Sequence, residues 1–249
     1  MNTLILSGAS GRMGRTVASM AEEYGFSVVA GVDPTGSSYA DFPVYRRFCD
    51  ISEHADVLID FSLPAALYDL GAYLEGAHLP AVLCATGYRE SEEAIIKKLS
   101  QTLPVFRSAN MSLGVYVLKR LAKEAKALLP DFDIEIVEKH HNKKADAPSG
   151  TALALLDAVQ SADTVPVFGR TKQSPARAQN EIGVHAVRGG TVAGEHEVGF
   201  YGDHETLLLT HSAQSRAVFA SGALKAARFL MDKPAGLYTM DDLFLGLTL

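Results

Sequence analysis

Residues 138–152 combine the side chains best suited to chemistry in this sequence. The first seven, residues 138–144, hold His140, His141 and three lysines against a single glutamate. Imidazole titrates near neutral pH, and a lysine ammonium loses its proton readily when it is desolvated. A histidine or Lys144 can therefore transfer a proton to or from a bound molecule. We predict that this segment binds an anionic small molecule and moves a proton on it.

The second half of the same segment supplies an anion-binding geometry. The chain turns at Pro148 and is expected to open a helix at Thr151, so that Ser149, Gly150 and Thr151 present hydroxyl and N–H groups at the positive end of the helix dipole. Such a site suits a carboxylate or a phosphate. A lysine-rich loop alone is commonly just solvated, and a Ser-Gly-Thr run is commonly just a helix cap. Their succession within 14 residues favours the functional interpretation.

A glycine-rich turn follows the first apolar run of the chain. Gly8, Gly11 and Gly14 have the spacing G-x-x-G-x-x-G. Gly8 allows a tight exit from a strand, Gly11 lets backbone N–H groups approach a pyrophosphate, and Gly14 lets the following helix pack closely on the sheet. Asp33 ends the second apolar run, where a carboxylate accepts hydrogen bonds from an adenine ribose. A plain strand–helix turn is the alternative, but the position of Asp33 favours dinucleotide binding.

The residues around Asp33 bear on the choice of cofactor. Pro34 and Thr35 follow it, and the next cationic side chain is Arg46. A ribose 2′-phosphate would therefore meet a carboxylate without an adjacent cation, which predicts that NADH is favoured, or at least well used, over NADPH. Arg12 in the glycine-rich turn is the residue that could reach a 2′-phosphate and reverse this preference.

Other chemistries lack their motifs. There is no H-E-x-x-H, and the two cysteines, Cys49 and Cys84, have no zinc spacing, so we expect no metal site. There is no G-x-S-x-G turn of a serine hydrolase and no phosphate-binding G-x-x-x-x-G-K-[ST] loop. Metal binding remains the competing interpretation only because histidines are numerous: His140, His141, His185, His196, His204 and His211.

Composition predicts a folded cytoplasmic protein. Of 249 residues, 47% are hydrophobic and 21% charged, which is typical of globular proteins. A net charge of −6 argues against a nucleic-acid partner, and no apolar run is long enough to span a membrane. Two cysteines indicate a reducing compartment, and the N-terminal residues have the pattern of a strand and lack that of a signal peptide.

The first 110 residues alternate short apolar runs with amphipathic stretches. This alternation predicts a doubly wound parallel sheet of the Rossmann type, because nearly continuous apolar strands are buried on both faces. Ser62, with Pro64 after it, and Ser91 are expected to cap two of the helices. The expected strands are Thr3–Ser7, Ser27–Val32, Ala55–Phe61, Ala81–Thr86 and Val105–Arg107.

The pattern changes after Met111. A helix is expected over 112–129, followed by strands of alternating polarity, with Gly189-Gly190 as a hairpin turn and residues 163–179 as a long loop. This predicts an α+β domain with an open mixed, largely antiparallel sheet. Residues 217–230 return to a helical period. The expected later strands begin around Phe132 and span Glu181–Arg188, Thr191–Val198 and Glu205–His211.

Several motifs together resemble the 4-hydroxy-tetrahydrodipicolinate (dihydrodipicolinate) reductase family over essentially the whole chain. The most specific is the segment from Glu135 through His140-His141 and Lys144 to Ala152. The glycine-rich turn resembles the nucleotide turn of that family. Further matching segments are Ser108–Val115, Arg188-Gly189-Gly190, Gly194-Glu195-His196 and Lys233–Tyr238.

The resemblance implies roles for individual positions. His140 is expected to be the catalytic acid/base and Lys144 the proton donor, with His141, Ser149, Gly150 and Thr151 binding the substrate. The implied cofactor contacts are Gly8, Ala9, Ser10, Gly11, Arg12, Met13, Asp33, Cys84, Ala85, Thr86, Ser108, Ala109, Asn110, Met111, Arg216 and Phe219.

The same resemblance implies an NAD(P)H-dependent reductase of a small dicarboxylate in lysine and diaminopimelate biosynthesis, commonly a homotetramer. Residues 1–111, completed by 217–249, would bind the dinucleotide, and residues 112–216 would bind substrate and form the oligomer. Cys84-Ala85 departs from the Gly-Thr that is common in the family, so a hydroxyl is lost and a thiol gained there. An aspartate dehydrogenase or a non-catalytic nucleotide sensor are the alternatives.

Overall fold

The computed structural model describes residues 1–247 and divides the chain into two compact units. The first unit comprises Met1–Ser112 together with the chain from Arg216 onward, and the second comprises Leu113–Ser215. No helix in the described part of the chain is long and apolar enough to cross a membrane.

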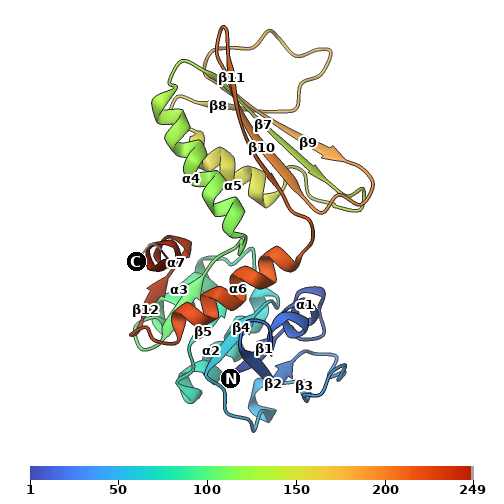
Figure 1. The fold of residues 1–249 in the computed structure, drawn as a ribbon, viewed down its shortest axis with the longest axis vertical. Helices are drawn as coiled ribbons and strands as arrows, with labels where there is room; N and C mark the ends of the chain where they lie inside the picture. Colours follow the sequence, from blue (N-terminus) through green and yellow to red (C-terminus); the bar gives the residue numbers. More distant parts are fainter. Residues whose placement is uncertain (248–249) are drawn as a thin grey trace. The chain divides into compact units, whose positions relative to one another are not determined.

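The first unit is built on a seven-stranded sheet in which every pairing is parallel. Its strand order is β12-β6-β5-β4-β1-β2-β3, and the order reverses between β1 and β4, as in doubly wound dinucleotide-binding sheets (Figure 1). Its elements are β1 (Asn2–Ser7), α1 (Arg12–Met20), β2 (Phe26–Val32), β3 (Val44–Tyr45), β4 (Val57–Asp60), α2 (Leu67–Ala77), β5 (Ala81–Leu83), α3 (Glu90–Leu99), β6 (Pro104–Arg107), α6 (Ala217–Leu230), β12 (Gly236–Tyr238) and α7 (Met240–Leu247), with 3₁₀ turns at Phe48–Asp50 and Pro64–Ala66.

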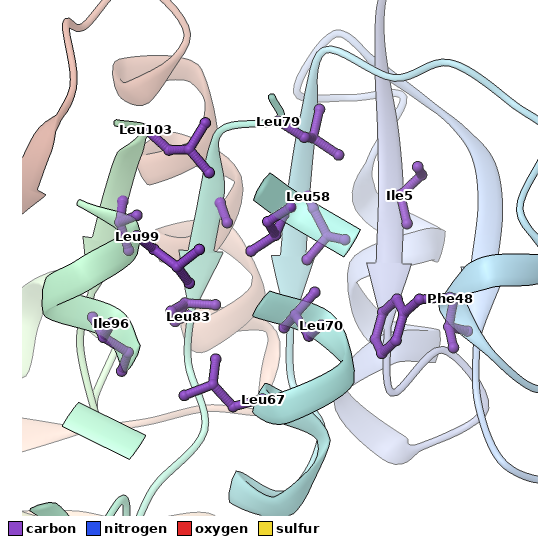
Figure 2. Packing of buried hydrophobic residues seen from close by; sticks show 14 of the residues in the cluster. Ile5, Phe48, Leu58, Leu67, Leu70, Leu79, Leu83, Ile96, Leu99 and Leu103 are labelled. Carbon is purple, nitrogen blue, oxygen red and sulfur yellow. The ribbon is translucent and has the colours of Figure 1, made fainter. Parts of the chain in front are cut away.

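The core of this unit explains why the residues of its strands are almost all apolar. Leu58 and Leu83, from β4 and β5, are fully buried and face Leu67 and Leu70 of α2 (Figure 2). α3 contributes the apolar stripe that includes Ile96. On the opposite face α6 packs against β4, β5 and β6, so both faces of the sheet are covered.

The second unit packs two helices on one face of a five-stranded sheet of order β11-β10-β7-β9-β8. Ile134 and Ile136 of β7 are buried, whereas Glu135 between them is not, which is the alternation expected of a half-covered strand. Its elements are α4 (Leu113–Leu128), β7 (Asp133–His140), α5 (Gly150–Val159), β8 (Val165–Phe168), β9 (Glu181–Arg188), β10 (Glu195–Tyr201) and β11 (Thr206–Ser212).

Two predicted helix caps are wrong. Ser62 does not cap α2, because a 3₁₀ turn over Pro64–Ala66 intervenes before the α-helix begins. Ser91 lies inside α3, which begins at Glu90. The Glu92 carboxylate accepts the backbone N–H of Arg89 at 2.8 Å, so an acidic side chain in the first turn reaches back to satisfy the helix start.

The predicted hairpin at Gly189-Gly190 is also wrong. β9 and β10 do not pair with each other, because β7 lies between them and pairs with both. β7–β9 and β8–β9 are parallel pairings, whereas β7–β10 and β10–β11 are antiparallel, so the predicted mixed sheet is confirmed. β10 begins four residues later than predicted, and β8 occupies part of the predicted loop as an edge strand, where Pro166 is tolerated. The predicted strand 181–188 and helix 217–230 are confirmed.

Candidate active site

A buried acid–base pair lies at the carboxyl end of β7. His140 Nδ1 is 2.5 Å from Glu138 Oε2, and both side chains point to the helix-covered face because they are two residues apart on one strand. Arg188 of the neighbouring β9 donates to both carboxylate oxygens, at 2.7 and 2.8 Å. This bidentate contact is the strongest geometry available to an arginine and a carboxylate.

The environment of Glu138 keeps its carboxylate ionised. Burial alone would raise the pKa of Glu138, but hydrogen bonds from Arg188 and His140 and from the Ser149 backbone N–H outweigh burial and lower it. The side chain has no solvent exposure. A fixed negative charge therefore lies directly against the His140 ring.

The residue at the start of α5 contacts the same Glu138 carboxylate. Ser149 is the helix cap: its Oγ accepts the Ala152 N–H at 3.2 Å, while its own N–H donates to Glu138 Oε1 at 3.0 Å. A Cβ atom built on Gly150 would have no neighbour within 4 Å, so the approach to the positive end of this helix is open on that side. The helix begins at Gly150, one residue before the predicted start at Thr151, with Ser149 as the cap residue.

His196 of β10 completes the buried network. Its Nε2 lies 3.1 Å from Ser149 Oγ, and its ring meets the His140 ring edge to face at 5.1 Å. Ser149 Oγ also accepts the Ala152 N–H, so the hydroxyl links His196 to the start of α5, and the tautomer of His196 decides which of the two groups donates. Burial is the largest of the causes that lower the pKa of His196 to about 4. The ring is therefore neutral at physiological pH.

The neutral state of His196 gives the second unit an acid-sensitive stability. A histidine whose folded pKa is depressed contributes its full stability above the ordinary value of 6.5 and loses it as the pH falls toward 4. Each unit of pKa difference is worth about 1.4 kcal/mol, so acidification from pH 7 to pH 5 is expected to remove about 2 kcal/mol through this group. Urea unfolding of His196→Gln, which cannot titrate, should lack that part of the decline; an identical pH dependence would contradict it.

Lys144 lies in the loop between β7 and α5. Its Nζ is 2.9 Å from Asp146 Oδ1, an ion pair that lowers the pKa of Asp146. Its backbone N–H donates to the His141 carbonyl, which closes a turn. The Arg188 guanidinium also donates to the Asp146 carbonyl at 2.6 Å. Arg188 therefore holds both Glu138 and the loop that carries the lysine.

In the first unit the glycine-rich turn joins β1 to α1. Gly8 has φ +73°, and a Cβ atom there would lie 2.8 Å from the Phe61 carbonyl oxygen. A Cβ atom at Gly14 would lie 2.3 Å from the Gly8 carbonyl oxygen. Gly11 is exposed at the helix start. The three glycines thus have the tight exit, the open approach and the close packing that a pyrophosphate cradle requires.

Asp33 directly follows β2 and faces this turn. Its carboxylate accepts the Ser10 N–H at 3.2 Å and the Thr35 N–H at 3.0 Å. A Cβ atom at Gly36 would lie 2.8 Å from Cγ of Arg46, so the arginine stem packs against the loop that follows Asp33. A cation that is 13 residues away in the sequence is therefore close to this loop in space.

The remaining cofactor candidates of the first unit follow the carboxyl ends of its strands or begin α6. Because all strands are parallel, the residues after β1, β2, β5 and β6 share one edge of the sheet. Arg216 precedes α6 and Phe219 lies in its first turn. The residues after β1 are Gly8, Ala9, Ser10, Gly11, Arg12 and Met13; those after β5 are Cys84, Ala85 and Thr86; those after β6 are Ser108, Ala109, Asn110 and Met111.

Sequence reasoning missed a buried polar cluster at the same edge. Asp60 ends β4, and its pKa is raised by burial despite hydrogen bonds from the Ser62 N–H at 3.0 Å and the Tyr88 hydroxyl at 3.4 Å. Cys84 is buried, and burial raises the pKa of its thiol, so it is an unreactive neutral group. Within the described residues there is no group of three or more His, Cys, Asp and Glu side chains suited to a metal ion.

Two family models cover nearly the whole chain: "Dihydrodipicolinate reductase, N-terminus" matches residues 2–111, and "Dihydrodipicolinate reductase, C-terminus" matches residues 114–244. The chain is 50% identical over 249 residues to a 4-hydroxy-tetrahydrodipicolinate reductase of Caldanaerobacter subterraneus, covering 98% of each. It is 46% identical over 248 residues to the enzyme of that name from Clostridium tetani, covering 97% of this chain and 96% of the relative.

A similar fold occurs in a dipicolinate-bound dihydrodipicolinate reductase from Paenisporosarcina sp. TG-14, with a TM-score of 0.78, 20% identity, and coverage of 96% of this chain and 97% of that one. At this identity the structural match concerns the fold alone. The family models and the sequence relatives span both units. This chain therefore belongs to the dihydrodipicolinate reductase family.

Proposed function

We propose that this protein reduces the 4-hydroxy-tetrahydrodipicolinate precursor to tetrahydrodipicolinate, using NAD(P)H, in lysine and diaminopimelate biosynthesis. It is an oxidoreductase of its family. The observation that carries the proposal is the second unit's combination of an ion-paired histidine, a lysine loop and an open, capped helix start. The matches to both family models and to relatives named 4-hydroxy-tetrahydrodipicolinate reductase support the same function.

The division of labour follows the two units. Residues 1–111, completed by 217–249, bind the dinucleotide, and residues 112–216 bind the substrate. The glycine-rich turn fits a pyrophosphate, since a Cβ atom at Gly8 or Gly14 would collide with backbone. Asp33 holds the adenine ribose, and the residues after β5 and β6, with Arg216 and Phe219, hold the nicotinamide half. The bound cofactor supplies the hydride.

The second unit supplies orientation and protons. The substrate is a cyclic imine-type dicarboxylate, and the dipicolinate carried by the Paenisporosarcina relative has the same two-carboxylate chemistry. Ser149, Gly150 and Thr151 receive a carboxylate at the positive end of α5, and His141 provides a further substrate contact. Negative charge builds toward the ring nitrogen as hydride arrives. Lys144 supplies the proton there, and His140 serves as acid/base.

A coupled assay tests this function. The unstable substrate is generated from pyruvate and aspartate semialdehyde by its synthase, and nicotinamide absorbance is followed after this protein is added. Consumption of the reduced cofactor only when the synthase is present is the expected result. Oxidation of aspartate by NAD with no reduction of the cyclic substrate would identify an aspartate dehydrogenase instead.

NADH is proposed to be favoured, or at least well used. Asp33 directs its carboxylate to the turn, which suits a free ribose hydroxyl and repels a 2′-phosphate. Arg46, packed against Gly36, is the nearest compensating cation after the strand. We expect kcat/KM for NADH to equal or exceed that for NADPH, and Arg46→Ala to lower only the NADPH value. A large NADPH advantage in the wild type would refute the preference.

A homotetramer is the proposed assembly. The face of the second sheet that α4 and α5 leave uncovered exposes Val187, Tyr201 and Leu208 by 47%, 38% and 50%. Large apolar side chains on one open sheet are typical of a subunit interface. Light scattering after gel filtration should give about four times the 26.6-kDa chain mass. A monomer mass would contradict this assembly.

The cytoplasm is the proposed compartment. The two cysteines, Cys49 exposed and Cys84 buried, form no disulfide. Free thiols are typical of a reducing compartment, where biosynthetic reductions with nicotinamide cofactors also take place.

A further inference from the structure

We propose that Glu138, clamped by Arg188, is a positioning residue that holds a proton on His140 Nδ1 and reserves Nε2 for proton exchange with the substrate. This inference rests on the proposed function and deepens it. Glu138 is called a positioning residue because it acts through His140. The inference is based on the contacts that three residues, Arg188, His140 and Ser149, make with the buried Glu138 carboxylate.

The first step is an accounting of donors around Glu138. Arg188 and the Ser149 N–H can only donate, and each already points at a carboxylate oxygen. An ionised carboxylate can only accept, so the 2.5 Å contact with His140 requires a proton on Nδ1. In a neutral imidazole the other nitrogen, Nε2, then carries a lone pair.

The second step concerns the space at Nε2. A Cβ atom built on Gly194 would lie 3.1 Å from His140 Nε2. Any side chain at this position would therefore press on the edge of the ring that carries the lone pair. Glycine avoids this close contact, while Glu138 occupies the other nitrogen. The two residues together leave Nε2 as the nitrogen available for exchange.

The third step is the rigidity of the clamp. Glu138 is fully buried. The Arg188 guanidinium that donates to it also donates to the Asp146 carbonyl in the Lys144 loop, and these two contacts together fix the arginine. A bidentate arginine–carboxylate pair has a single low-energy arrangement. The same arginine therefore fixes both the carboxylate that orients the His140 ring and the loop that carries Lys144.

Glu138→Gln tests the tautomer because the neighbours dictate how the amide must lie. The glutamine oxygen has to face the Ser149 N–H, since two donors cannot meet there. The NH₂ group then faces His140 Nδ1, which must become an acceptor and move its proton to Nε2, and it also replaces the oxygen that accepted from Arg188, so one half of the bidentate contact is lost. The variant preserves the size of the side chain while reversing the tautomer.

We expect kcat of Glu138→Gln to fall by about 100- to 1,000-fold, as when a histidine base is held in the wrong tautomer. KM for the cyclic substrate and Kd for dipicolinate, measured with NADH bound, should stay within about threefold of wild type. Nitrogen NMR of histidine-labelled protein, assigned with His140→Gln, should show the proton on Nδ1 in the wild type and on Nε2 in the variant.

Two controls separate the outcomes. Asp157→Asn makes the same kind of change at an exposed residue of α5 that accepts a hydrogen bond from the Gln160 side chain, and it should leave kcat and the melting temperature unchanged. Glu138→Asp keeps the charge and should recover part of kcat. Wild-type turnover in Glu138→Gln, or a weakening of dipicolinate binding with kcat intact at saturation, would overturn the proposal. An inactive wild type would refute the proposed function, while the NMR tautomer still decides this inference.

Discussion

Lys144→Ala is expected to lower kcat by about two to four orders of magnitude, the range that loss of a general acid commonly produces. The lysine ammonium lies on the loop beside the open start of α5, paired with Asp146 at 2.9 Å. Under the proposed function, removing this ammonium leaves the ring nitrogen of the substrate without its proton source. The affinity for NADH should remain within about twofold of wild type, because all the proposed dinucleotide contacts belong to the first unit. Steady-state rates and fluorescence titration with NADH measure both quantities.

Lys143→Ala is the matched control for this experiment. Lys143 precedes Lys144 in the same loop, carries the same charge and is exposed. We expect its substitution to change kcat by less than about threefold, because a solvated lysine contributes little to a specific geometry. If Lys144→Ala turned over normally, or if both variants lost the same activity, general electrostatic attraction would replace proton donation as the role of this loop.

The arrangement of the first unit was predictable because its signals are local. Continuous apolar runs separated by amphipathic stretches leave few alternatives to a parallel sheet covered on both faces, and the glycine spacing marks the nucleotide turn. The Gly189-Gly190 hairpin failed for the converse reason. Two glycines specify a turn but not which strands pair beyond it, and β7, some 50 residues earlier, inserts between the two.

The site was only partly predictable for the same reason. The sequence placed His140, Lys144 and Ser149 in one segment, and the structure brings His140 and Ser149 together through Glu138. Arg188 and His196 were missed as parts of this network, because the pairing of β9 and β10 with β7 brings them there. Glu138 had an available signal, since it lies two residues from His140 on one strand and must share its face.

Gly14→Ala is the second large effect, and it should abolish tight cofactor binding. The added Cβ would lie 2.3 Å from the Gly8 carbonyl oxygen and 2.6 Å from the Ala9 carbonyl oxygen. Both atoms belong to the backbone of the nucleotide turn, so no side chain can rotate away and the turn itself must move. Loss of one or two charge-assisted N–H contacts to the pyrophosphate corresponds to about a 10- to 100-fold rise in Kd for NADH.

The same substitution in another helix isolates that cause. A Cβ atom at Gly76 of α2 has no neighbour within 4 Å, so Gly76→Ala should leave the Kd for NADH unchanged and stabilise the protein by up to about 1 kcal/mol. Gly14→Ala should instead lose about 1–3 kcal/mol of unfolding free energy, the usual cost of overpacking. Calorimetric titration with NADH and urea unfolding of both variants provide the comparison. Wild-type affinity in Gly14→Ala would mean that the close contact between α1 and the turn does not shape the cofactor site, and the dinucleotide would have to be held by the ends of β5 and β6 alone.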